Sequence, residues 1–104
     1  MDGKRVLSCI TPATRADGKA ITTIEGLATG DSLHPVQEAF LAEGAIQCGY
    51  CTPGMTLTAV AFLEKNPRPT DEEIVEAMTG NLCRCCGYPK ILNAVRRAAK
   101  QARR

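Results

Sequence analysis

Residues 48–54 read CGYCTPG, and residues 85–90 read CCGYPK. In each stretch cysteines and a Gly-Tyr pair stand close before a proline, a residue favoured in the first turn of a helix. A helical apolar pattern precedes and follows both stretches, so the chain repeats one plan of helix, cysteine loop and helix. Two such hairpins packed side by side predict a mostly α fold, a four-helix antiparallel bundle with both cysteine loops at the same end.

Two amphipathic helices are expected around the first loop. Pro35 suits the first turn of a helix, and Gly44 suits its end. The second helix begins at Pro53 and ends before Asn66-Pro67, because a proline disfavours helical geometry in the residue before it. The side chains expected to face the core are Val36, Phe40, Met55, Ala59, Phe62 and Leu63.

Two further helices are expected around the second loop. The third begins with a capping box, in which Thr70 and Glu73 satisfy each other's backbone N–H groups, and it ends at Gly80. The fourth begins at Pro89. The side chains expected to face the core are Ile74, Ala77, Met78, Ile91, Leu92, Val95, Ala98 and Ala102.

Residues 1–30 have a different pattern. The turn dipeptides Asp2-Gly3 and Asp17-Gly18 precede short apolar or β-branched runs at 6–10 and 21–24, which predict strands. Two or three short strands do not form a stable sheet without partners. We therefore divide the chain at residue 30 and expect a helical domain over 31–104. We also expect Met1 to be internal to a longer protein, with a genuine truncation as the alternative.

Composition limits the classes of function. The chain has 104 residues and no tryptophan, so it buries only a modest core. Its net charge of +2 arises largely from cations within residues 96–104, which favour the C-terminal end of a helix and do not indicate nucleic-acid binding. No membrane span or signal peptide is recognisable. We expect a cytoplasmic protein, in which clustered cysteines bind metal or serve redox chemistry rather than form disulfides.

Four cysteines have the spacing of metal ligands. Cys48 and Cys51 form a C-x-x-C pair, and Cys83 and Cys85 form a C-x-C pair. Four thiolates suit zinc or an iron–sulfur cluster, and the spacing alone does not choose between them; cysteines that bind nothing are a further alternative. Both loops lead into helix N-termini, which stabilise anionic groups. His34, the single histidine, is expected to cap a helix or lie on the surface rather than bind metal.

The stretches EGAIQCGYCTPGM and TGNLCRCCGYPKI resemble the [2Fe–2S]-binding helical domain of the molybdenum hydroxylases. That family includes xanthine dehydrogenases, aldehyde oxidoreductases and the small subunit of aerobic carbon monoxide dehydrogenase. The resemblance extends from DGKRVLSC to ILNAV, over essentially the whole chain. It implies a [2Fe–2S] cluster bound by Cys48, Cys51, Cys83 and Cys85, and molybdopterin contacts at Gln47 and the backbone around Cys85.

The resemblance also implies a role. The chain would be an electron-transfer subunit without catalytic residues, which relays electrons from the molybdenum cofactor of a large subunit toward a second cluster and the FAD of a medium subunit. Residues 1–30 would be the remnant of a β-grasp, plant-type ferredoxin domain. We expect the partner surface around Gln47, Tyr50, Arg84 and Tyr88, although the two tyrosines are equally suited to packing the loops. The alternatives are a structural zinc module, which holds its metal with four cysteines and mediates protein contacts, and a non-functional remnant.

Two cysteines depart from the family pattern. Cys9 matches one ligand of the ferredoxin-type cluster, but the other three are absent from this sequence, so we expect an ordinary half-buried residue on a strand. Cys86 stands where relatives usually have threonine. A conservative replacement is the simpler interpretation, and a second thiolate that exchanges with Cys85 as a ligand is the alternative.

Overall fold

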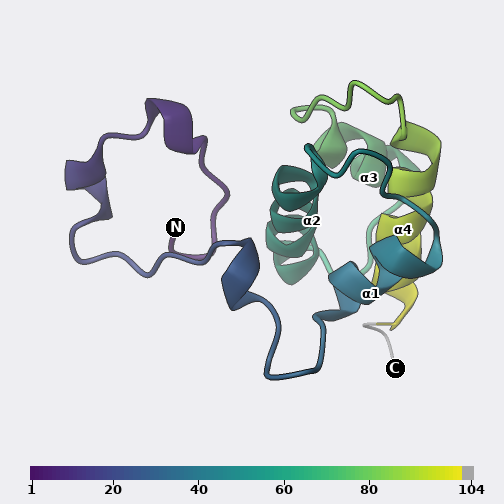
Figure 1. Ribbon diagram of the computed structural model, residues 1–104, viewed down its shortest axis with the longest axis horizontal. Helices are drawn as coiled ribbons and strands as arrows, with labels where there is room; N and C mark the ends of the chain where they lie inside the picture. Colours follow the sequence, from purple (N-terminus) through teal and green to yellow (C-terminus); the bar gives the residue numbers. More distant parts are fainter. Residues whose placement is uncertain (102–104) are drawn as a thin grey trace.

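The computed structural model describes residues 1–101, which contain four α-helices and three short 3-10 helices (Figure 1). The α-helices are α1 (Pro35–Ala42), α2 (Thr52–Lys65), α3 (Asp71–Met78) and α4 (Tyr88–Gln101). The 3-10 helices are η1 (Ser8–Ile10), η2 (Ala13–Ala16) and η3 (Ile24–Gly26). The predicted mostly α fold is therefore confirmed, and each α-helix begins within one residue of its expected start. Within the described residues, no helix has the length and apolar character to cross a membrane.

The four α-helices share one apolar core. Its largest side chains come from all four helices, and each exposes at most 2% of its surface: Phe40, Met55, Ile74, Ile91 and Val95. α1 has its most extensive contact with α4, and α2 and α3 close the other side. Ala39 and Ala94 are fully buried, and their small side chains let helices approach closely.

Most of the core residues predicted from the sequence are confirmed. Phe62, Leu63 and Leu92 are half-buried against the core. Ala102 lies outside the described residues. The prediction missed two buried threonines of α2, Thr56 and Thr58, because a hydroxyl group counts as polar in an apolar pattern.

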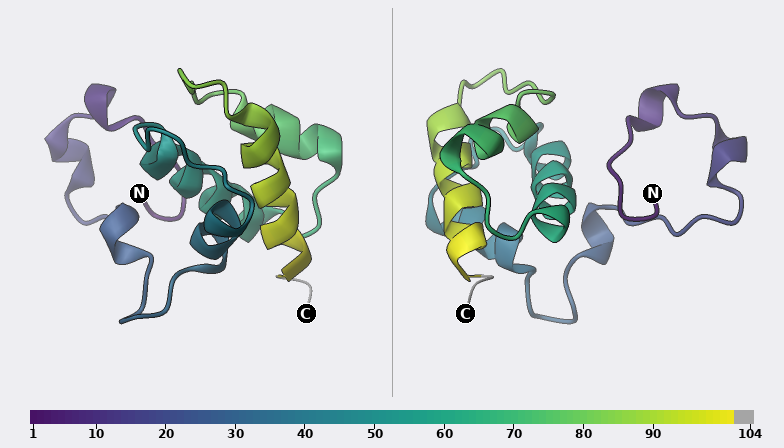
Figure 2. Two further views of the ribbon diagram at one scale, coloured as in Figure 1. Left: turned by 45° about the vertical axis from the view of Figure 1, so that its right-hand side comes forward. Right: turned by 180° about the vertical axis from the view of Figure 1, so that it is seen from behind.

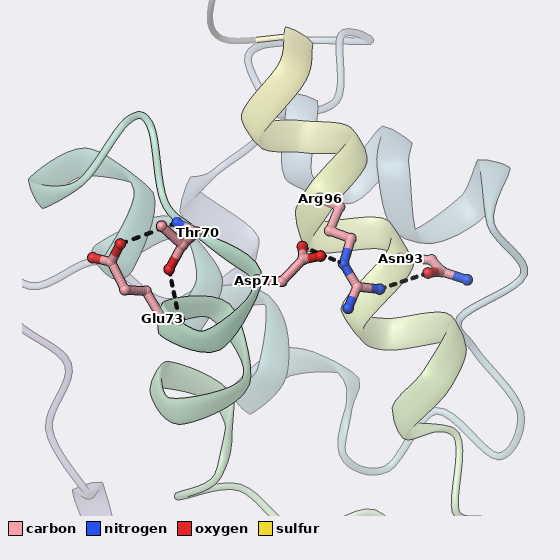
Figure 3. Close-up of polar contacts among 5 residues, drawn as sticks. All are labelled: Thr70, Asp71, Glu73, Asn93 and Arg96. Carbon is pink, nitrogen blue, oxygen red and sulfur yellow. Dashed lines mark hydrogen bonds and ion pairs between the residues drawn. The ribbon is translucent and has the colours of Figure 1, made fainter.

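Helix ends are fixed by side chains near them. Thr70 Oγ1 accepts a hydrogen bond from the Glu73 N–H at 3.3 Å, and Glu73 Oε1 accepts one from the Thr70 N–H at 3.1 Å (Figure 3). Hydrogen bonds with Thr70 and Asn66 lower the pKa of the Glu73 carboxyl. His34 caps α1 in the same way, since its Nδ1 accepts from the Val36 N–H at 3.1 Å. The predicted capping box and the predicted role of His34 are both confirmed.

An ion pair joins the start of α3 to α4. Arg96 Nε donates to Asp71 Oδ1 at 2.8 Å, and Arg96 Nη1 donates to Asn93 Oδ1 at 2.8 Å (Figure 3). Asp71 exposes 69% of its side chain, so water screens this pair and it contributes little to stability. The apolar core therefore supplies most of the stability of this helix pair.

The prediction of strands at residues 6–10 and 21–24 is wrong. The described residues contain no strand, and only an isolated bridge joins Thr29 and Ser32. The segment instead forms a wide loop beside α2 (Figures 1 and 2). A 2.8 Å hydrogen bond from the Asp2 N–H to the Ala20 carbonyl joins the two ends of this loop. A strand needs a neighbouring strand for its hydrogen bonds, and these runs have none in the described part of the chain.

The N-terminal loop packs incompletely on α2. η3 contacts α2, but the apolar side chains of Leu7, Ile10 and Ile21 are 51%, 74% and 58% exposed. Cys9 lies in η1 and is exposed, so the expectation of a half-buried residue on a strand is also wrong. A cavity of about 600 Å³ lies between this loop and α2.

We predict that Thr70→Ala lowers the free energy of unfolding by about 1 kcal/mol, because the Glu73 N–H loses its acceptor at the first turn of α3. Urea unfolding followed by circular dichroism measures this change. Thr14→Ala is the control, since Thr14 is exposed in the N-terminal loop, and it should have no effect. An equal loss in both variants would contradict the assignment of the cap.

Candidate metal centre

The two cysteine loops lie at the same end of the helical unit (Figure 1). The loop between α1 and α2 carries Cys48 and Cys51, and the loop between α3 and α4 carries Cys83 and Cys85. Gln47 Nε2 donates to the Cys85 carbonyl at 3.4 Å, which links one loop directly to the other. The thiols of Cys51 and Cys83 lie close enough for each to shift the pKa of the other. Residues far apart in the sequence are thus brought together as the repeated plan predicts.

Backbone N–H groups point at two of the sulfur atoms. The Gly87 N–H donates to Cys83 Sγ at 3.4 Å, and the Tyr50 N–H donates to Cys48 Sγ at 3.5 Å. Gly49, between Tyr50 and Cys48, has φ of +83°, a conformation that glycine adopts without strain. Hydrogen bonds of this kind stabilise negative charge on sulfur and raise the reduction potential of a bound cluster.

The neighbouring thiols of Cys51 and Cys83 have pKa values shifted in opposite directions. The hydrogen bond from the Gly87 N–H lowers the pKa of the Cys83 thiol. Burial raises the pKa of the Cys51 thiol, and the nearby Cys83 and Cys48 thiols raise it further. The Gly87 N–H thus favours the thiolate form of Cys83. A thiolate is the form in which cysteine binds metal.

Cys85 is held by its backbone. Its carbonyl accepts from Gln47, and its thiol is half-buried. Within residues 1–101, no three His, Cys, Asp or Glu side chains are gathered into a single-ion site. The structure places Cys51 close enough to Cys83 and to Cys48 for each to affect its pKa. Cys85 lies in the same loop as Cys83, and the complete ligand set stays a prediction.

The remaining side chains of the two loops differ sharply in exposure. The Tyr88 hydroxyl accepts a hydrogen bond from the Cys83 N–H at 2.7 Å, so Tyr88 packs the second loop. Tyr50 is 94% exposed and Leu82 is 86% exposed, and Arg84 is exposed as well. Packing is thus the role of Tyr88, whereas Tyr50 is free to contact a partner. No sequence pattern pointed to Leu82, because it fits no helical apolar face.

Cys86 has an unusual backbone conformation. Its φ is +56°, and its thiol is exposed. The left-handed region costs a residue with a Cβ about 1 kcal/mol. The Cys86 N–H donates to the Cys83 carbonyl at 3.2 Å, so the tight turn of the C-x-C loop imposes this conformation.

We predict that Cys86→Gly raises the free energy of unfolding by about 0.5 kcal/mol, because glycine relieves the strained φ but gains freedom in the unfolded chain. Cys86→Ser is the matched control, since serine keeps the Cβ and should leave stability unchanged. Urea unfolding of the metal-free chain measures both variants. Equal stability of the glycine and serine variants would show that the turn carries no strain.

The comparisons with known proteins agree with these loops. The family model described as "[2Fe-2S] binding domain" matches residues 23–96, a range that includes all four predicted ligands. The nicotinate dehydrogenase small FeS subunit of Eubacterium barkeri is 55% identical over 100 residues, 96% of this chain and 64% of that protein. The nicotine 6-hydroxylase small subunit of Paenarthrobacter nicotinovorans is 53% identical over 95 residues, 91% of this chain and 57% of that protein.

Solved structures have the same fold. Quinoline 2-oxidoreductase from Pseudomonas putida 86 matches with a TM-score of 0.90 and 45% identity, over 98% of this chain and 64% of that one. Aldehyde oxidoreductase from Desulfovibrio gigas matches with a TM-score of 0.88 and 42% identity, over 94% of this chain and 11% of that one. The chain thus spans 64% and 57% of the length of the two curated relatives.

Proposed function

Because the chain belongs to the family of [2Fe–2S] binding domains, we propose that it is the electron-transfer component of a molybdenum hydroxylase-type oxidoreductase. The observation that carries this proposal is the meeting of two cysteine loops, with backbone N–H groups directed at sulfur, inside the range matched by the family model. The relatives named as small subunits of nicotinate dehydrogenase and nicotine 6-hydroxylase support it.

The proposed cluster ligands are Cys48, Cys51, Cys83 and Cys85. Two antiparallel helical hairpins would present them, one pair from each hairpin tip. The donor set fits a [2Fe–2S] cluster, since it consists of thiols alone and lies beside the N-termini of α2 and α4. When bound, such a cluster takes up and releases one electron at a time. The chain's own residues bind it, supply N–H donors to its thiolates and half-bury Cys51 and Cys83 against the core.

Partner contacts are proposed at the loop end. Gln47 and the backbone of Cys85 already lie together, and we assign to them the contact with molybdopterin on a large subunit. Tyr50, Leu82 and Arg84 project from the same end and provide the surface for that subunit. Electrons would then pass to a second cluster and to FAD on a medium subunit. We place this assembly in the cytoplasm.

The domain division at residue 30 also belongs to this proposal. Residues 1–30, which contain no strand in the described structure, would be the remnant of a ferredoxin-like β-grasp unit, and residues 31–104 would be the helical cluster-binding domain. The exposed apolar side chains of Leu7, Ile10 and Ile21 support this division, because such side chains suit a sheet that covers them.

We predict that the chain, reconstituted anaerobically with iron and sulfide, holds two irons and two sulfides per chain, as a [2Fe–2S] cluster requires. A dithionite titration should consume one electron per chain and produce an EPR signal. Replacing Cys48, Cys51, Cys83 or Cys85 by serine should remove most of the iron, because each loses one of four thiolates.

Cys9→Ser and Cys86→Ser are the matched controls and should keep full iron content and an unchanged EPR spectrum. A changed spectrum in Cys86→Ser would support exchange of ligands between Cys86 and Cys85. Stoichiometric zinc without iron or sulfide would overturn the proposal and favour a structural zinc module.

A further inference from the structure

A hydrogen bond between two side chains ties the second cysteine loop to the helix that follows the first. Thr58 Oγ1, on α2, donates to Asn81 Oδ1 at 2.9 Å. Thr58 is only 4% exposed, and Asn81 is half-buried just after α3. Asn81 lies two residues before Cys83, so this bond holds the backbone that leads into the C-x-C pair.

A glycine makes room for the same asparagine. A Cβ at Gly54 would lie 3.2 Å from Asn81 Nδ2, closer than an ordinary van der Waals contact. Gly54 has no positive φ, so the backbone does not require glycine there. Glycine within a helix costs about 1 kcal/mol relative to alanine. A Cβ at position 54 would require the Asn81 amide to shift by a few tenths of an ångström, so glycine in the first turn of α2 leaves room for that side chain.

The two contacts span the candidate metal centre. Gly54 lies three residues after Cys51, and Asn81 lies two residues before Cys83. The other link between the loops is the bond from Gln47 to the Cys85 carbonyl, which is exposed and longer, at 3.4 Å. A shorter, partly buried bond holds its geometry more firmly than a longer, exposed one. Of these two links, the one through Asn81 is the stronger constraint on the distance between the cysteine pairs.

We propose that Asn81 is a positioning residue, which sets the separation and orientation of the C-x-x-C and C-x-C pairs through its contacts with Thr58 and Gly54. The inference rests on the proposed cluster function. Asn81 does not touch the cluster ligands' sulfur atoms in this role. It acts through the loop that carries Cys83.

Loss of the Asn81 side chain should affect the loop more than the stability of the fold. Without Asn81, the Thr58 hydroxyl can turn to a carbonyl in the preceding turn of α2, as threonine does within helices. The cost to folding is then small, while the loop loses its attachment to α2. A positioning role therefore predicts a larger effect on the bound cluster than on the stability of the metal-free chain.

The test uses the reconstituted chain with Asn81→Ala and Thr58→Val, which remove the acceptor and the donor. Each variant should still bind two irons, but iron should pass to a chelator about ten-fold faster, the scale on which partners of metal ligands act. The EPR spectrum should broaden. Thr58→Ser keeps the hydroxyl and should restore the wild-type rate and spectrum.

Thr56→Val is the matched control, because Thr56 is a buried threonine on the same helix. It should leave the chelation rate and the spectrum unchanged. The double variant of Asn81→Ala with Thr58→Val should be no worse than either single variant, since both remove one bond.

Wild-type spectra and chelation rates in Asn81→Ala and Thr58→Val, with only a shift in urea unfolding, would reduce the bond to a structural contact and overturn the inference. Failure of the wild-type chain itself to hold iron and sulfide would overturn the proposed function instead. The two failures are therefore distinguishable.

Discussion

The position of the two cysteine loops relative to each other depends on the apolar core. Three helices contribute Phe40, Met55 and Ile91 to this core, and these side chains have almost no exposed surface. Burying a side chain of this size contributes about 1.5–3 kcal/mol, whereas an exposed hydrogen bond such as that from Gln47 to Cys85 contributes about 1 kcal/mol at most. Apolar packing therefore decides where the loops meet, and polar contacts refine the geometry. The proposed ligand set requires such a core, because each loop carries only two of its four thiols.

Much of the helical part could be predicted from the sequence because its signals are local. Thr70 and Glu73 cap α3 through bonds within one turn, and Gly44 ends α1 with φ of +61°. The repeat of cysteine, Gly-Tyr and proline placed both loops before helix N-termini without knowledge of the tertiary contacts. The hydrogen bond between Thr58 and Asn81 could not be found in this way, because it joins residues that lie 23 positions apart. Nothing in the spacing of either residue indicates the other.

The N-terminal strands show the opposite case. The runs at residues 6–10 and 21–24 have the β-branched and apolar side chains of strands, but strand formation depends on a partner that a local pattern does not reveal. In the described residues these runs pair with nothing, and the backbone instead forms 3-10 turns with hydrogen bonds such as that from the Ile10 N–H to the Leu7 carbonyl. The helices need no such partner, because their hydrogen bonds are internal. For this reason the sequence predicts the helices correctly and the N-terminal strands incorrectly.

Backbone N–H groups, rather than cationic side chains, stabilise negative charge on the sulfur atoms of the two loops. Arg84, between Cys83 and Cys85, is exposed, and the polar contacts described at sulfur are the N–H groups of Gly87 and Tyr50. Backbone N–H groups stay fixed by the turn, while an arginine side chain needs to be ordered before it contributes. An exposed Arg84 remains free to meet a partner's negative charge. The same short stretch thus separates two tasks: its backbone stabilises thiolates, and its side chains at 82 and 84 face outward.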